Sequence, residues 1–81
     1  MKFHKRNDLV CVSWIDAESV DEWTFLADMC DDLPPVLTVG LVVSHTKTLI
    51  IVACNHDTKN NSYSCIIKIP TGMIQKVKLL K

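Results

Sequence analysis

The stretch that decides the fold is 34–69, PPVLTVGLVVSHTKTLIIVACNHDTKNNSYSCIIKI. Three apolar runs rich in β-branched residues follow one another in it, separated by polar breaks, and this is the pattern of successive β-strands. We place these strands at 36–44, 48–55 and 63–69. The polar connection 45–47 is short, so the first two of them are expected to run antiparallel.

Two features of this stretch predict how the sheet is shaped. Gly40 lies in the middle of the first run, where a glycine marks a bulge or a sharp bend. A small barrel needs such a bend to carry a strand round a corner. The segment 55–62 holds no apolar residue and predicts a loop between the last two strands.

The chain on either side supplies two further strands. The run LVCVSWI at 9–15 is apolar on both faces, which predicts a strand covered on one side by the core and on the other by a neighbour or a partner. Residues 70–72 break the pattern as a turn, and 74–80 is the last strand. Residues 1–7 are expected to form a loose terminal tail.

Between the first two strands lies a longer segment with the signature of a helix. Ser19 and Glu22 fit a capping box, and apolar residues recur behind them at near-helical spacing. The proline pair at 34–35 stops any helix before the next strand. We therefore place one short helix at 20–29, with an irregular excursion containing a single helical turn as the alternative.

The order of these elements resembles an SH3-like or Sm-like small barrel. The ending IIKIPTGMIQKVKLL at 66–80 is similar to the second half of the Sm motif, in which a turn joins the last two strands. Sm proteins place their helix before the first strand, and the glycine and aspartate–asparagine features of their RNA-binding loops have no counterpart here. We expect 1–81 to form one mainly β domain, a five-stranded antiparallel SH3-like/Sm-like small barrel with one short helix between strands 1 and 2.

Charge is balanced overall but unevenly placed. The 81 residues carry nine basic and nine acidic side chains, and seven of the acids fall between 16 and 32, where there is no lysine or arginine. From 33 onward the only acid is Asp57, against six lysines. These segments are either solvated surfaces or complementary faces that dock head to tail between identical subunits. The lack of a basic excess argues against binding to duplex DNA.

Several classes of function lack support in the sequence. Cys11, Cys54 and Cys65 lie in apolar strand patterns, where we expect small buried side chains rather than disulfides or metal ligands. Gly40 and Gly72 are the only glycines, so no phosphate loop is present, and no catalytic pair can be placed. We expect no enzyme, no cofactor and no metal site. No apolar run reaches the roughly 18 residues of a membrane span, and we expect a soluble cytosolic protein.

A second set of features covers most of the chain. A Trp-x-Asp strand end, an Asp-x-Trp helix start, a Val-Gly strand and an Ile-Pro turn occur in this order, at Trp14, Asp16, Asp21, Trp23, Val39, Gly40, Ile69 and Pro70. The combination resembles a family of small proteins encoded by bacteriophages. This resemblance implies a phage accessory protein in the cytoplasm of the bacterial host, and it assigns no particular activity.

Five residues are candidate ligand contacts: Trp14, Asp16, Trp23, Lys59 and Lys68. The two tryptophans could stack on a base or another planar ligand, with Asp16 as a hydrogen-bond acceptor. The alternative, which we favour, is that both indoles pack in or across the core. Lys59 could meet a phosphate and Lys68 could face a subunit interface or a shared pocket, although for both we favour an ordinary solvated lysine.

Two functional hypotheses follow. The first is a phage counter-defence protein, a homo-oligomer that sequesters a small signalling nucleotide at its subunit interfaces. The phage-like elements, the first strand with two apolar faces and the separated charges motivate it. The second is an interaction module that inhibits a host protein through an apolar patch. An Sm-like RNA-binding ring ranks last because the charge is balanced.

Overall fold

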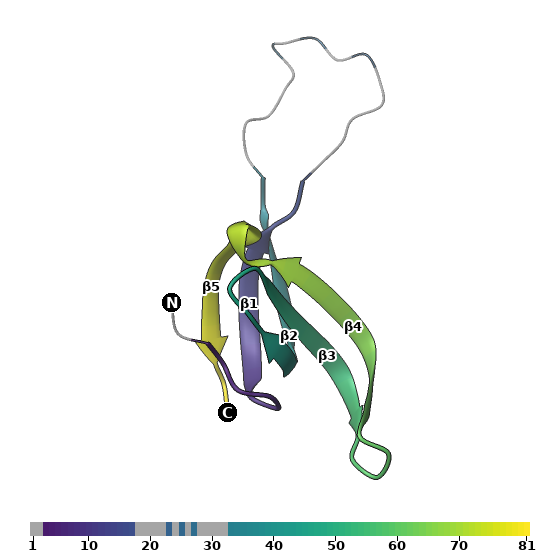
Figure 1. Cartoon of the computed structure of the whole chain (residues 1–81). Coiled ribbons are helices and arrows are strands. Elements are labelled where there is room, and N and C mark those ends of the chain that lie inside the picture. The colour runs from purple at the N-terminus through teal and green to yellow at the C-terminus, as the bar shows by residue number, and fades with distance from the viewer. Residues whose placement is uncertain (1–2, 18–22, 24, 26, 28–32) are drawn as a thin grey trace.

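The fold is one antiparallel β-sheet (Figure 1). The structure is a computed structural model and describes residues 3–17, 23, 25, 27 and 33–81. The strands are β1 (Leu9–Ile15), β2 (Pro35–His45), β3 (Leu49–Asp57), β4 (Ser62–Pro70) and β5 (Ile74–Leu79), with the 3₁₀ turn η2 (Thr71–Met73) between the last two. All five strands begin and end within two residues of their predicted positions, which confirms the mainly β, antiparallel fold.

The strands lie in the order β4-β3-β2-β1-β5. β1 is paired on both sides, with β2 from Leu9↔Leu41 to Ile15↔Pro35 and with β5 from Val10↔Leu79. Pro35 takes the first position of β2, where its missing N–H removes no essential ladder bond. In the described part of the chain, β4 and β5 are therefore the two edge strands of the sheet.

The core lies on one face of the curled sheet. Alternate residues of β1 are buried, as the period of two in a strand requires. The buried cluster consists of Val10, Val12, Trp14, Val42, Ile50, Val52 and Ile69. Ile67 of β4 and Ile74 and Val77 of β5 pack against this cluster from the two edges of the sheet. The main stabilising contribution is thus burial of branched aliphatic side chains.

The prediction of a closed barrel is wrong, because the sheet is open. Within residues 33–81 and 3–17, β4 pairs only with β3, and β5 pairs only with β1. Pro70 ends β4 without an N–H to donate, and η2 then leads β5 onto β1 rather than beside β4. A register shift between Ser13 and Trp14 accompanies the β5 pairing. The two edges share a core but no hydrogen-bond ladder.

Gly40 lies where two strands approach each other closely. It pairs with Val10 of β1, and a Cβ at this position would lie 2.5 Å from the carbonyl oxygen of Ala53 and 2.7 Å from Cγ1 of Val52. Both distances are below any normal contact, so no side chain fits. Glycine is required here because β2 is pressed against β3 at the point where the sheet curls.

The N-terminal segment, predicted as a loose tail, makes hydrogen bonds to β2. The main-chain N–H of Asn7 donates to the carbonyl oxygen of Val42 at 2.7 Å, and the main-chain N–H of Val42 donates to the carbonyl oxygen of Asp8 at 2.9 Å. Nε of Arg6 donates to the carbonyl oxygen of Val43 at 3.1 Å. This segment therefore extends the sheet contacts beyond β1 and brings His4 next to the end of β2.

The predicted helix at 20–29 lies outside the described residues, apart from Trp23, Phe25 and Ala27, and stays a prediction. Trp23 and Phe25 are exposed. Among the residues that the structure places, no helix combines the length and the apolar character needed to cross a lipid bilayer.

Candidate functional site

The candidate site is a cavity of about 490 Å³ between the N-terminal segment, the end of β2 and the outer edge of β5. Its polar lining consists of His4, His45, Thr71, Gln75 and Lys76, and its apolar lining of Ile74, Val77 and Leu79. Binding sites for small molecules have volumes of about 300–1,000 Å³ and combine apolar walls with a few polar groups. The cavity has both properties.

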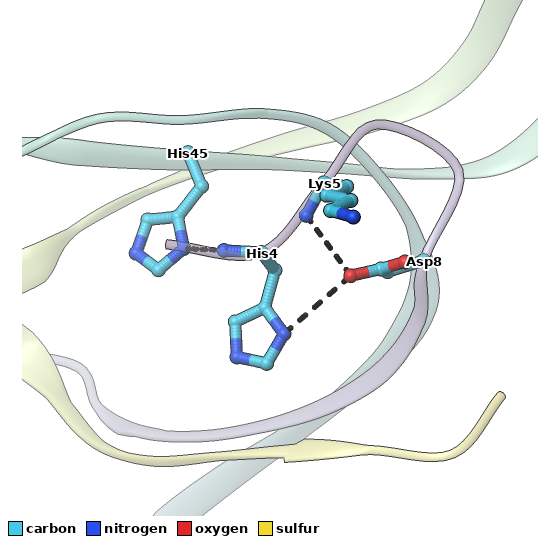
Figure 2. A network of polar contacts seen from close by, with 4 residues as sticks. All are labelled: His4, Lys5, Asp8 and His45. Atoms are coloured by element: carbon cyan, nitrogen blue, oxygen red, sulfur yellow. Dashed lines mark hydrogen bonds and ion pairs between the residues drawn. The ribbon is translucent and has the colours of Figure 1, made fainter. Parts of the chain in front are cut away.

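Two histidines from distant parts of the chain line one side of this cavity. Figure 2 shows the contacts between them. The main-chain N–H of His4 donates a hydrogen bond to Nδ1 of His45 at 3.0 Å. The two imidazole rings are stacked, with centroids 5.6 Å apart and planes inclined by 11°. The ring of Phe3 meets His45 edge-on, at a centroid distance of 5.2 Å. His45 is therefore held between a peptide bond and two rings.

These contacts fix the protonation state of His45. Because Nδ1 accepts a hydrogen bond from an N–H group, it carries no hydrogen, and the neutral ring carries its hydrogen on Nε2. Burial, and secondly the neighbouring His4, lower the pKa of His45 below its ordinary value of 6.5. The hydrogen bond to Nδ1 and the lowered pKa therefore both indicate that His45 is neutral at neutral pH, with Nε2–H as a hydrogen-bond donor.

Asp8 orients His4. Its Oδ2 atom lies 3.8 Å from Nδ1 of His4 and accepts a hydrogen bond from the main-chain N–H of Lys5 at 2.9 Å. The turn between Lys5 and Asp8 is closed by a hydrogen bond of 3.1 Å from the N–H of Asp8 to the carbonyl oxygen of Lys5. Asn7 takes the left-handed conformation in this turn, with φ of 71°, which asparagine tolerates better than most residues. The turn formed by residues 5–8 therefore helps to hold the ring of His4 in place.

The polar lining of the cavity offers groups that can bind an anion. Thr71, the one hydroxyl residue of the lining, donates its hydroxyl hydrogen to the carbonyl oxygen of Lys47 at 2.9 Å, so no base activates it. Among the described residues, no three His, Cys, Asp or Glu side chains are placed to hold a metal ion. The polar lining offers imidazoles, an amide and the flexible ammonium of Lys76, which are groups that bind an anion.

The two tryptophans of the predicted site lie in different environments. Trp14 is in the core, and its Nε1–H donates a hydrogen bond to Oγ1 of Thr38 at 3.0 Å. Trp23 is fully exposed, at 104% of its reference area. The two indoles therefore do not stack on each other in the single chain. The core interpretation is confirmed for Trp14, and packing of Trp23 across the core is not what the structure shows.

The three polar candidates are also spread over the molecule. Asp16 lines a second cavity, of about 330 Å³, with Met73 and Gln75. Lys59 is in the β3–β4 hairpin turn, where its main-chain N–H donates to Oδ1 of Asp57 at 3.1 Å. Lys68 is exposed on β4, opposite Ile51. The hairpin and the ends of β1 and β2 that lead into the long excursion lie at opposite ends of the sheet (Figure 1), so Lys59 and Asp16 do not line one site in the single chain.

The outer face of β1 and β2 carries an apolar surface. Leu37 and Val39 are exposed, at 67% and 53%, and pair with Ser13 and Cys11 of β1. We call the set Cys11, Leu37, Val39 and Leu41 the outer patch. Lys76 and Lys78 of β5 pair with Ser13 and Cys11 and therefore lie on the same side of the sheet, at the margin of the outer patch.

The cysteine prediction is wrong for two of its three residues. Cys54 and Cys65 are exposed, and Cys11 is half-buried; all three are free thiols. The reason is that β3 and β4 extend past the core at their hairpin end, where the apolar pattern has no opposite layer to pack against. Cys54 and Cys65 are thus available for chemistry that a buried thiol cannot perform.

Sequence reasoning missed His4 and His45 as members of one site. The two residues are 41 positions apart, and no local sequence pattern indicates that they meet. In addition, His4 belongs to a segment predicted to be a loose tail. Comparisons of the chain with protein families, curated proteins and solved structures gave no significant match. The site is therefore interpreted from its own geometry.

Proposed function

We propose that the chain is a non-catalytic binding protein that takes a small nucleotide in the cavity between His4, His45 and β5. The observation that carries this proposal is the composition of the lining: apolar side chains from β5 beside two imidazoles and Lys76. A nucleotide combines a planar apolar base with an anionic phosphate. The base would lie against Ile74 and Val77 on the inner face of β5. The phosphate would meet the Nε2–H of His45 and the ammonium of Lys76, whose long side chain would reach round the open edge of β5 from the outer face.

Self-association is the second element of the proposal. Leu37 and Val39 of the outer patch are exposed in the single chain, whereas a small soluble domain normally keeps such apolar surfaces covered. β1 is buried on its inner face and half-buried on its outer face, as expected for a strand that a partner completes. A homo-oligomer formed through this patch would place the lysines at its margin beside the neighbouring subunit.

The fold and origin complete the proposal. The strand order β4-β3-β2-β1-β5 and the turn η2 between the last two strands support an SH3-like or Sm-like relationship, in which the barrel has opened along its β4 and β5 edges. The phage-like elements at Trp14, Gly40 and Pro70 support a counter-defence protein that works in the cytoplasm of a bacterial host. Sequestering a signalling nucleotide is the activity that fits a binding site without a catalytic group.

Isothermal titration calorimetry against a panel of cyclic mono- and dinucleotides tests the proposed function. At least one nucleotide should bind the wild-type protein, and His45→Ala and Lys76→Ala should each weaken that binding by about tenfold or more, equivalent to ~1.4 kcal/mol. Lys59→Ala is the matched control, because it removes a lysine from the hairpin turn, and it should bind like the wild type. Absence of heat with every nucleotide would remove the proposal.

A second function is favoured by the outer patch alone. An exposed apolar face on a small domain also suits a module that inhibits a host protein directly. Affinity purification from host lysate distinguishes the two functions. Capture of one stoichiometric protein by the wild type, lost with Leu37→Asp and kept with His45→Ala, would select the interaction module.

A further inference from the structure

Cys54 of β3 and Cys65 of β4 lie opposite each other. The register pairs Ala53 with Ile66 and Asn55 with Ser64, which leaves one cysteine between them on each strand. In a regular antiparallel ladder such as the pairs on either side, opposite residues point to the same face, with Cα atoms about 4.5–5.5 Å apart. Disulfides join residues whose Cα atoms are about 4.4–6.8 Å apart. The spacing of the two strands thus matches a disulfide without a large movement of the backbone.

Side-chain contacts between β3 and β4 hold the two strands together next to the cysteines. On the hairpin side, Nδ2 of Asn55 donates a hydrogen bond to Oγ of Ser64 at 3.1 Å. One position further, the rings of His56 and Tyr63 stack with centroids 4.2 Å apart and planes inclined by 4°. These cross-strand contacts keep β3 and β4 together beyond the core, where both thiols are exposed.

The ladder is interrupted at the cysteines themselves. Cys65 has a φ of 54°, in the left-handed region that non-glycine residues seldom adopt, and the pair 54/65 is absent from an otherwise continuous register. The backbone at this point is therefore not fixed by the ladder bonds that constrain its neighbours. A local adjustment that brings the two sulfur atoms together would break no strand pairing on either side.

We propose that Cys54 and Cys65 form a reversible intramolecular disulfide, with a low-molecular-weight disulfide such as oxidised glutathione as the oxidant. The thiolate of one cysteine attacks a glutathione sulfur, which forms a mixed disulfide and releases one glutathione thiolate that takes up a proton. The second cysteine, as its thiolate, attacks the protein sulfur of the mixed disulfide and releases the second glutathione. Two protein thiols lose two electrons and two protons, and one oxidised glutathione becomes two reduced molecules.

The bond would close the hairpin segment 55–64 and fix the edge strand β4 to β3. The backbone of β4 near Cys65 would then be constrained in the oxidised protein and free to adjust in the reduced protein. This inference rests on the β3–β4 register and on the exposure of the two thiols. It is independent of the nucleotide proposal, since neither cysteine lines the cavity.

Tryptic mapping of the full chain tests the disulfide directly. The protein is equilibrated in buffers of stepped ratios of reduced to oxidised glutathione, alkylated, and digested with trypsin without reduction. Cleavage separates the cysteines cleanly, because Cys54 falls in peptide 48–59, Cys65 in peptide 60–68, and Cys11 and Cys30 together in peptide 7–47. We expect peptides 48–59 and 60–68 to be joined in oxidising buffers, in a protein whose intact mass is that of one chain less two hydrogen atoms.

Serine variants supply the controls. Cys54→Ser should accumulate a glutathione adduct on Cys65, because the resolving thiol is missing, and Cys65→Ser should do the same on Cys54. Cys11→Ser should keep the 48–59/60–68 link. The proposal is overturned if the wild type carries glutathione on both cysteines without the link, if both stay alkylated at every ratio, or if the link appears only in covalent dimers.

Discussion

The main-chain N–H of His4 donates a hydrogen bond of 3.0 Å to Nδ1 of His45, which ties the N-terminal segment to the end of β2. The bond exists only while Nδ1 is unprotonated. The same two residues form one wall of the candidate cavity, so the protonation state of His45 affects both the attachment of the N-terminal segment and the shape of the site.

The stability of the fold should therefore fall on acidification. His45 has a pKa below 6.5 in the folded chain and recovers the ordinary value on unfolding, so the unfolded state binds the proton more readily. Stability is fully present above pH 6.5 and decreases as the pH drops from there towards the folded-state pKa. The other titratable groups nearby are His4, Asp8, whose Oδ2 lies 3.8 Å from Nδ1 of His4, and Lys76 across the cavity.

Urea unfolding at a series of pH values checks this prediction. His45→Gln keeps a hydrogen-bond acceptor without a titrating group and should flatten the dependence between pH 6.5 and the folded-state pKa. His56→Gln, which removes an imidazole of β3 that does not line the cavity, is the matched control for the loss of a histidine. Equal pH slopes for the wild type and His45→Gln would contradict the assignment.

Gly40→Ala should destabilise the sheet by roughly 1–3 kcal/mol, the usual range for forced overpacking. The added Cβ would lie 2.5 Å from the carbonyl oxygen of Ala53, and a backbone atom cannot move aside as a flexible side chain would. Gly72→Ala is the matched control: nothing lies within 4 Å of its added Cβ, and the change should be neutral or slightly stabilising. Thermal or urea unfolding of both variants measures the difference, and equal effects would show that β2 and β3 are not in close contact at Gly40.

The two tryptophans should behave differently on truncation. Trp14→Ala removes a core side chain and its hydrogen bond to Thr38, and we expect a loss of about 3–5 kcal/mol. Trp23→Ala changes an exposed side chain and should alter stability by less than about 0.5 kcal/mol. In the single-tryptophan protein Trp14→Phe, the remaining fluorescence should be freely quenched by acrylamide. Protected emission from that protein would place Trp23 in a covered environment, for example at a subunit contact.

The outer patch should drive self-association. Leu37→Asp places a charge in the middle of the outer patch and should lower the mass of the native particle towards that of one chain, while leaving the stability of the chain within about 0.5 kcal/mol, since Leu37 is exposed. Thr58→Asp, in the exposed hairpin turn, adds the same charge elsewhere and should leave the mass unchanged. Sedimentation velocity of the wild type and the two variants measures the mass of each particle. An unchanged particle with Leu37→Asp would exclude this face as the interface.

The strand framework could be predicted from the sequence because each strand carries its own local signal. The β-branched runs, the proline at the start of β2 and the polar hairpin 55–62 define where strands begin and end. Gly40 also stands out in the sequence, where it predicts a bulge or a sharp bend. The structure shows instead a close approach to the backbone of Ala53. These features depend on neighbours in the chain and need no knowledge of the tertiary arrangement.

The candidate site could not be predicted, because it depends on contacts between distant segments. His4 reaches His45 through a turn at Asn7 that pairs with Val42, and none of these contacts has a local pattern. The prediction of a closed barrel is wrong for a similar reason. Whether β5 pairs with β4 or with β1 is decided by the path of η2 and by the register of β1, which have no local pattern in the sequence. The exposure of Cys54 and Cys65 depends on where the core ends, which an apolar run alone does not show.

Native mass spectrometry of the protein as purified from a bacterial host, repeated after denaturing extraction of small molecules, measures self-association and the bound nucleotide together. We expect a particle of more than one chain that carries a nucleotide, loses that mass on extraction, and fails to carry it in the His45→Ala variant. A bare single chain in both preparations, with no small molecule recovered in the extract, would contradict it.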